Sequence, residues 1–141
     1  MRSMKKGFTP AELCPTPKAT AAGLFTALTA PEDATSVKFA RPAMELQQVS
    51  STSAKWVVAF QQSEDSETWP VSTATPGLFA GATLAAQNTE GTYYSSAAGD
   101  GFEAVTLSKR YVRWGIWALN NAGVSTFEMA QCAIRVEKRS C

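Results

Sequence analysis

Apolar and polar residues alternate along Tyr111–Leu119, which reads YVRWGIWAL. A repeat of two residues is typical of a β-strand, because successive side chains of a strand point to opposite faces of the sheet. This run leads into a polar stretch containing Asn120, Asn121 and Gly123, and a second alternating run follows over Val124–Glu137. Two alternating runs around a turn with asparagine and glycine predict a β-hairpin.

The first of these runs has two unlike faces. One face is apolar throughout and consists of Val112, Trp114, Ile116 and Ala118. The other face is mixed and consists of Tyr111, Arg113, Gly115 and Trp117. We expect the apolar face to pack into the core, because the charged Arg113 lies on the other one. Trp117 then lies outside, where three interpretations stay open: it contacts a ligand, lies in a subunit interface, or packs under a loop.

Earlier segments show the same β-type pattern from Ser36 onward. Lys55–Gln62 predicts a strand with a mixed second face, which a loop or a neighbouring subunit could cover, and a core face made by Trp56, Val58 and Phe60. Pro42 cannot donate a hydrogen bond to a sheet, so it predicts a bulge or a sheet edge, and Met44 and Leu46 resume the inward phase beyond it. Gly99–Asp100–Gly101 predicts a tight turn.

The predicted strands are short and recur roughly every 10–15 residues with no convincing amphipathic helix between them, as in an antiparallel β-sandwich. We therefore predict an all-β protein with a single antiparallel β-sandwich over residues 21–141. Residues 1–20 hold three of the seven prolines and show no periodicity, which predicts an extended N-terminal arm.

Composition narrows the classes of function. A chain of 141 residues is long enough for one domain with its own core. Histidine is absent, which removes the commonest general base and the commonest metal ligand. We expect a protein that is not an enzyme and that holds no cofactor and no metal. The net charge of +1 argues against nucleic acid or an anionic membrane as a partner.

Acidic residues offer two further chemistries. The three acids of the turn Ser63–Glu67 could ligate Ca²⁺, but the EF-hand spacing is missing and such a turn is normally just solvated. A glycosidase would need a pair of carboxylates that meet in space. No feature of the sequence brings together the other acids that could form one, which are Asp100, Glu103, Glu128 and Glu137.

The three cysteines are far apart and lack a metal-binding spacing. Cys132 alternates with apolar neighbours, so we expect it to be a buried thiol. Cys14 and Cys141 could pair only if the two ends of the chain meet. The start of the chain lacks the apolar core of a signal peptide, and no stretch approaches roughly 20 apolar residues. We expect a soluble chain with neither an export signal nor a transmembrane segment.

Two stretches resemble known β-sandwich families. Ala118–Ser125 (ALNNAGVS) is similar to the A-x-N-x-x-G-x-S hairpin of fibronectin type III domains, and Lys55–Trp69 resembles a strand, acidic turn and tryptophan that those domains share with phage tail and capsid proteins. Their S-x-D-G-x-T-W pattern is matched except that Ser66 replaces the glycine. The resemblance covers about half of the chain. It implies an immunoglobulin- or fibronectin III-like sandwich, or a jelly-roll-like one, used as a non-catalytic adhesion, spacer or virion-type module.

Exposed aromatic residues are the most plausible means of binding. Sugar rings stack on tryptophan and tyrosine, although filling the core is the common role of aromatic residues in a sandwich. The residues that we select as ligand or interface candidates are Tyr93, Tyr94, Tyr111, Arg113, Trp117 and Trp69. The expected function is protein–protein contact or assembly, with a protein partner or as a homo-oligomer. The alternative is a carbohydrate or small-molecule binding module.

Overall fold

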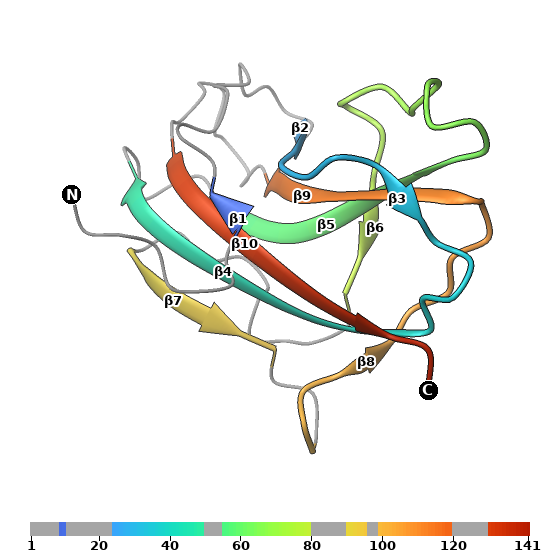
Figure 1. The fold of residues 1–141 in the computed structure, drawn as a ribbon. Helices are drawn as coiled ribbons and strands as arrows, with labels where there is room; N and C mark the ends of the chain where they lie inside the picture. The colour runs from blue at the N-terminus through green and yellow to red at the C-terminus, as the bar shows by residue number, and fades with distance from the viewer. Residues whose placement is uncertain (1–8, 11–23, 50–54, 80–89, 96–98, 120–129) are drawn as a thin grey trace.

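A computed structural model describes residues 9–10, 24–49, 55–79, 90–95, 99–119 and 130–141. Within these ranges every regular element is a β-strand (Figure 1). The strands are β1 (Thr9–Pro10), β2 (Leu24–Ala27), β3 (Glu32–Asp33), β4 (Phe39–Val49), β5 (Lys55–Ser63), β6 (Gly77–Leu78), β7 (Gly91–Tyr94), β8 (Glu103–Ala104), β9 (Tyr111–Leu119) and β10 (Ala130–Arg139). No helix in this part of the chain is long and apolar enough to cross a membrane.

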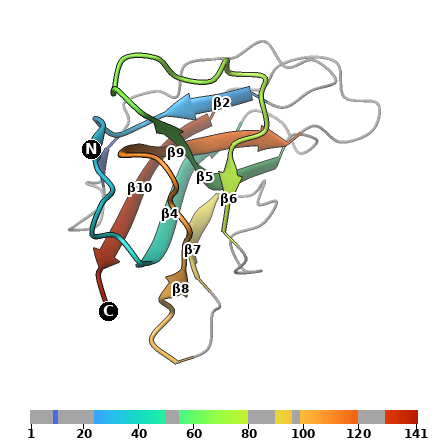
Figure 2. The same ribbon diagram turned by 90° about the vertical axis from the view of Figure 1, so that its right-hand side faces the viewer.

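The strands form two antiparallel sheets, so the predicted all-β fold with antiparallel sheets is confirmed. Sheet A has the order β1-β10-β4-β7, with β8 also paired to β4. Sheet B has the order β2-β9-β5-β6, with β3 also paired to β9. The chain passes from one sheet to the other between most successive strands, as the colours in Figures 1 and 2 show. Within the predicted N-terminal arm, β1 pairs with β10 at Ile134 and Ala133.

The predicted hairpin between the two alternating runs is wrong. Both runs contain strands, but β9 pairs with β2, β3 and β5 in sheet B, whereas β10 pairs with β1 and β4 in sheet A. A turn signal reports only that the chain reverses locally, and it does not select the partner of each strand. The connection itself, residues 120–129, lies outside the described ranges.

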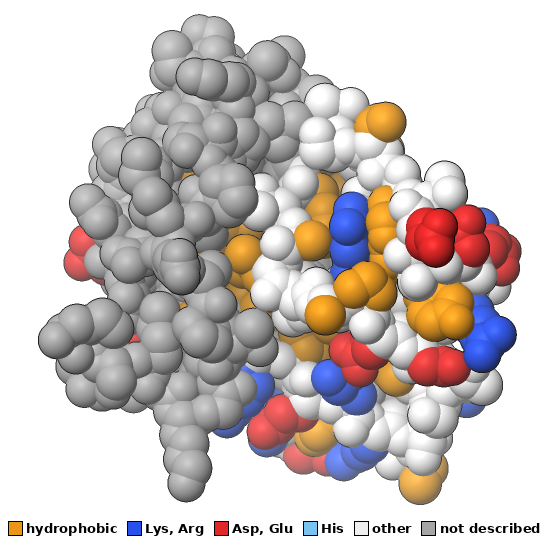
Figure 3. Space-filling model, turned by 45° about the horizontal axis from the view of Figure 1, so that its top comes forward, with side chains coloured by type: hydrophobic (Ala, Val, Ile, Leu, Met, Phe, Trp, Pro, Cys, Tyr) orange, Lys and Arg blue, Asp and Glu red, His pale blue; other side chains and the backbone are white. Residues whose placement is uncertain are grey.

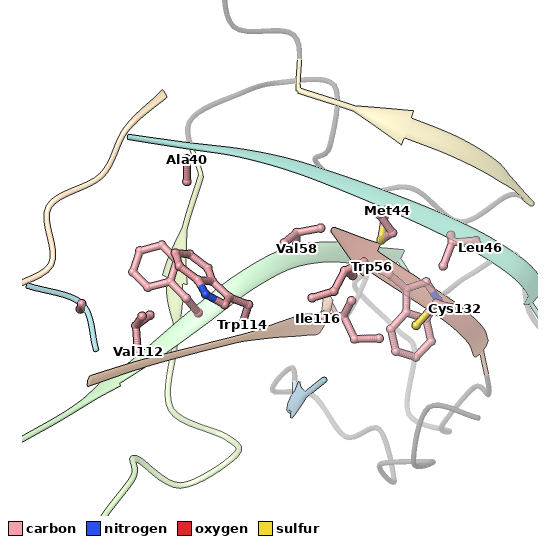
Figure 4. Packing of buried hydrophobic residues seen from close by; sticks show 12 residues of the cluster. Ala40, Met44, Leu46, Trp56, Val58, Val112, Trp114, Ile116 and Cys132 are labelled. Atoms are coloured by element: carbon pink, nitrogen blue, oxygen red, sulfur yellow. The ribbon is translucent and has the colours of Figure 1, made fainter. Parts of the chain in front are cut away.

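The core lies between the two sheets (Figure 4). As predicted, sheet B contributes the inward faces of β5 and β9, and all six side chains are buried: Trp56, Val58, Phe60, Val112, Trp114 and Ile116. Sheet A contributes Met44, Leu46, Cys132 and Ile134. Trp114 packs edge-on against Phe60 at 5.5 Å between ring centroids, and its indole N–H donates to Glu32 at 2.5 Å. The polar end of this buried ring is therefore satisfied, as a buried tryptophan requires.

Pro42 does not mark a bulge or a sheet edge. It is buried in β4, a central strand that pairs with β10 on one side and with β7 and β8 on the other. Its carbonyl accepts from Ser95 N at 3.2 Å, so its nitrogen faces the gap between β7 and β8, where no donor is needed. The register of the β4–β10 pair shifts elsewhere, between Gln131 and Cys132, which pair with Gln48 and Leu46.

The cysteines differ from the prediction. Cys132 is buried as expected, but it is disulfide-bonded and is not a free thiol. Cys141 is exposed and free, so a disulfide between Cys14 and Cys141 does not form. Cys14 lies outside the described ranges. Alternation with apolar residues identified the buried position, but burial alone does not distinguish a thiol from half of a disulfide.

Candidate binding cleft beside Trp69

The outer face of sheet B is covered in part by the segment that joins β5 to β6, residues 64–76 (Figure 2). This segment is tied down by Gln61 Nε2, which donates to Pro70 O at 3.2 Å, and by Phe25 N, which donates to Ser72 O at 2.8 Å. On the side of the molecule seen in Figure 3, hydrophobic, basic and acidic side chains are interspersed over the described surface. The two hydrogen bonds of residues 64–76 show that a loop of the same chain covers part of the mixed outer face of sheet B.

Arg113 lies at the centre of this arrangement. It stands opposite Gln61 in the β5–β9 register, and its Nε and Nη2 donate to Gln61 Oε1 at 3.1 and 2.7 Å. Its guanidinium carbon also lies 4.3 Å from the centroid of the Trp69 ring, which is a cation–π contact. Burial lowers the pKa of Arg113, although a guanidinium stays charged at neutral pH. Arg113 thus holds the loop on the sheet.

The acidic turn that precedes Trp69 is organised around Asp65. Its Oδ1 accepts from Glu67 N at 2.9 Å, from Thr68 N at 2.8 Å and from the Ser63 hydroxyl at 3.0 Å. The Thr68 hydroxyl donates to Oδ2 at 3.1 Å. These hydrogen bonds, those from the backbone first, hold the pKa of Asp65 well below its usual value. Both carboxylate oxygens of Asp65 serve the turn itself.

Ser66 adopts a positive φ of 61° in the same turn. This is the position at which the similar S-x-D-G-x-T-W pattern has glycine, the residue that enters this region at least cost. The Ser66 N–H donates to Ser63 Oγ at 3.0 Å, and the Ser66 carbonyl accepts from the Trp69 indole N–H at 3.2 Å. The turn therefore fixes the orientation of the Trp69 ring.

A cleft of about 470 Å³ opens between this turn and the segment before β9. We call it the Trp69 cleft, and it is lined by Gln62, Ser63, Glu64, Asp65, Thr68, Trp69, Pro70 and Lys109. Gln62 Oε1 accepts from Ser108 N at 2.7 Å and from Lys109 N at 3.1 Å. These two hydrogen bonds join the two walls of the cleft. The Lys109 ammonium lies 3.4 Å from Glu64 Oε2. The volume is within the usual range for small-molecule sites, about 300–1,000 Å³.

The other predicted candidates do not gather here. Tyr93 and Tyr94 lie on β7 in sheet A, where Tyr93 packs partly buried against the core and Tyr94 is 47% exposed. Tyr111 is half-buried, and the guanidinium carbon of Arg110 lies 5.3 Å from the centroid of the Tyr111 ring. Trp117 is half-buried on the outer face of β9, opposite Phe25 and Val57. Of the six candidates, the described contacts bring together Trp69 and Arg113.

A second, smaller groove of about 270 Å³ lies on sheet A beside Tyr94, and its charged lining residues are Arg41, Arg135 and Asp100. Arg41 Nε donates to Glu137 Oε1 at 2.7 Å, and Arg139 Nη1 lies 2.9 Å from Asp100 Oδ2. Both guanidiniums lie over the Phe102 ring, with their carbons 5.0 Å (Arg41) and 4.0 Å (Arg139) from the ring centroid. Asp100 and Glu137, two of the acids considered for a glycosidase, each bind an arginine here. Glu128 lies outside the described ranges.

Sequence reasoning missed Gln62 and Lys109. Gln62 ends a strand as an ordinary polar residue, and Lys109 lies 47 positions later in a polar connection. No local signal links them, because their contact depends on how sheet B assembles. The described residues contain no cluster of three or more His, Cys, Asp or Glu side chains that could hold a metal ion.

Comparisons with family models, with curated proteins and with solved structures find no match.

Proposed function

We propose that the two sheets form a jelly roll. With β2 and β3 counted as one strand, and β7 and β8 as another, the described residues form eight strands in two sheets. Their orders are first–eighth–third–sixth and second–seventh–fourth–fifth. A jelly roll is a double sheet of eight strands built from two Greek keys. In an immunoglobulin-type sandwich the last two strands share a sheet. Here β9 and β10 lie in different sheets, which favours the jelly-roll alternative.

We infer that this jelly roll is a non-catalytic module for protein–protein contact or assembly, with copies of itself as the first partner. The strand order carries this proposal, because jelly rolls recur as capsid and lectin domains. The lack of histidine in the chain is consistent with a role that needs no general base.

Two exposed hydrophobic side chains suggest where contact occurs. Val71, in the segment that covers sheet B, is 68% exposed, and Leu78, on the edge strand β6, is 47% exposed. Both lie on the stretch that leaves β5 and returns to pair with it. Complete burial of a fully exposed valine or leucine side chain contributes about 1.5–3 kcal/mol, and a second protein surface would gain the share of it that belongs to the exposed parts of these two side chains.

Size-exclusion chromatography with light scattering, over a wide range of concentration, tests the proposal. We expect wild-type protein to self-associate and Leu78→Glu and Val71→Glu to shift it toward the monomer. Thr75→Glu is the matched control, because Thr75 is an exposed polar residue of the same segment. A wild-type protein that stays strictly monomeric at the highest concentration would remove the main support for self-assembly.

A further inference from the structure

We propose that the Trp69 cleft binds a neutral saccharide. This inference is independent of the proposed assembly function, since the cleft residues are distinct from Val71 and Leu78. It rests on three properties of the cleft: a pre-oriented aromatic ring, a rim that both donates and accepts hydrogen bonds, and charged groups that already have partners.

The apolar part of the cleft consists of Trp69 and Pro70. The C–H face of a pyranose ring is apolar and complements the π-face of an indole. The Trp69 ring is held by its N–H bond to Ser66 O at 3.2 Å and by Arg113 at 4.3 Å. A ring fixed before binding loses little rotamer freedom when a ligand arrives, so more of the contact energy appears as affinity.

The polar rim suits hydroxyl groups, which both donate and accept hydrogen bonds. The Glu64 carboxylate, on a side chain that is 72% exposed, can accept, and the Lys109 ammonium, on one that is 45% exposed, can donate. Gln62 Oε1 already accepts two backbone N–H groups, which fixes the amide and leaves its NH₂ group as the donor. Donors and acceptors thus lie around one apolar surface.

The charges of the rim favour an uncharged ligand. The Lys109 ammonium is paired with Glu64 at 3.4 Å, and the Asp65 carboxylate is occupied by its own turn. An anionic ligand would meet two carboxylates around one lysine, and a cationic ligand would compete with that lysine. A sugar with no charge meets neither penalty.

The experiment is a screen of the purified chain on an array of neutral glycans, followed by titration of the strongest hit by saturation-transfer NMR and calorimetry. Trp69→Ala should weaken binding about tenfold or more, as the loss of an aromatic stacking contact predicts. The matched control is Tyr94→Ala, which removes an exposed aromatic ring from the opposite sheet and should leave binding unchanged.

Because Trp69→Ala also removes the partner of Arg113, two rim variants serve as a second test. Glu64→Gln and Lys109→Ala should each weaken binding several-fold without changing the unfolding midpoint, because both side chains are well exposed. The proposal is overturned if no neutral glycan binds at millimolar concentration. It is also overturned if Trp69→Ala binds like the wild type, or if only acidic glycans bind. Self-association is measured separately, so either proposal can fail alone.

Discussion

Ser66 offers a direct test of the turn that orients Trp69. Its φ of 61° lies in the left-handed region. A residue with a Cβ atom is about 1–2 kcal/mol less stable there than in the right-handed region, whereas glycine has no such cost. Ser66→Gly removes this cost. Glycine also gives the unfolded chain more freedom, which offsets about 0.4–1 kcal/mol. We expect a net gain of about 0.5–1 kcal/mol in the free energy of unfolding.

Urea unfolding followed by tryptophan fluorescence measures this gain. With a slope of about 1–2 kcal/mol per molar urea, the midpoint should rise by roughly 0.5 M. The two hydrogen bonds of Ser66 in the turn are made by its backbone N–H and carbonyl, so the substitution keeps both. Ser66→Ala is the control, because alanine retains the Cβ atom and should leave the midpoint nearly unchanged. A glycine variant that unfolds at lower urea than the wild type would refute the reasoning.

Three further outcomes follow from other contacts. Hydrogen bonds lower the pKa of Asp65 from 3.8 in the folded protein. The ionised Asp65 carboxylate therefore stabilises the folded state fully above pH 3.8, and this stabilisation is lost as the pH falls below that value. Urea midpoints should thus drop more in the wild type than in Asp65→Asn between about pH 7 and about pH 3. In Gly115→Ala, the new Cβ would lie 2.0 Å from the Thr26 carbonyl oxygen, and we expect a loss of about 1–3 kcal/mol. A wild-type melting temperature would contradict that close approach. Because Cys132 is disulfide-bonded and Cys141 is free, a thiol assay on unfolded, unreduced chain should find one thiol, and three after reduction. Finding three before reduction would exclude the disulfide.

The faces of the long central strands were predictable from sequence, because side-chain direction in a strand follows from a repeat of two residues. Trp56 and Trp114 are buried as their alternation predicts. Strand pairing was not predictable in the same way. Even the paired residues nearest in sequence, Ser63 of β5 and Tyr111 of β9, are 48 positions apart, and no local pattern encodes such a choice. The same holds for Pro42, whose position is explained only by the gap between β7 and β8.

The candidate site was predictable in part. Trp69 and Arg113 were selected as exposed candidates, and the acidic turn was recognised from its composition. The contact between them was not foreseen, because it joins the loop after β5 to β9, two segments that only the assembly of sheet B brings together. Lys109 was missed because an exposed lysine in a polar connection has no distinguishing pattern. Sequence reasoning therefore identified the chemical groups but not the cleft that they line.

The sheet order also has a consequence for how this chain folds during synthesis. β10, which follows all the other described strands in the sequence, lies inside sheet A between β1 and β4, so that sheet cannot be completed until residues 130–139 have left the ribosome. Until then the inward side of β4, with Met44 and Leu46, lacks its neighbour. Sheets dominated by such distant pairings fold on the scale of milliseconds to seconds. Nascent chains should thus depend on protection from aggregation until β10 has been synthesised.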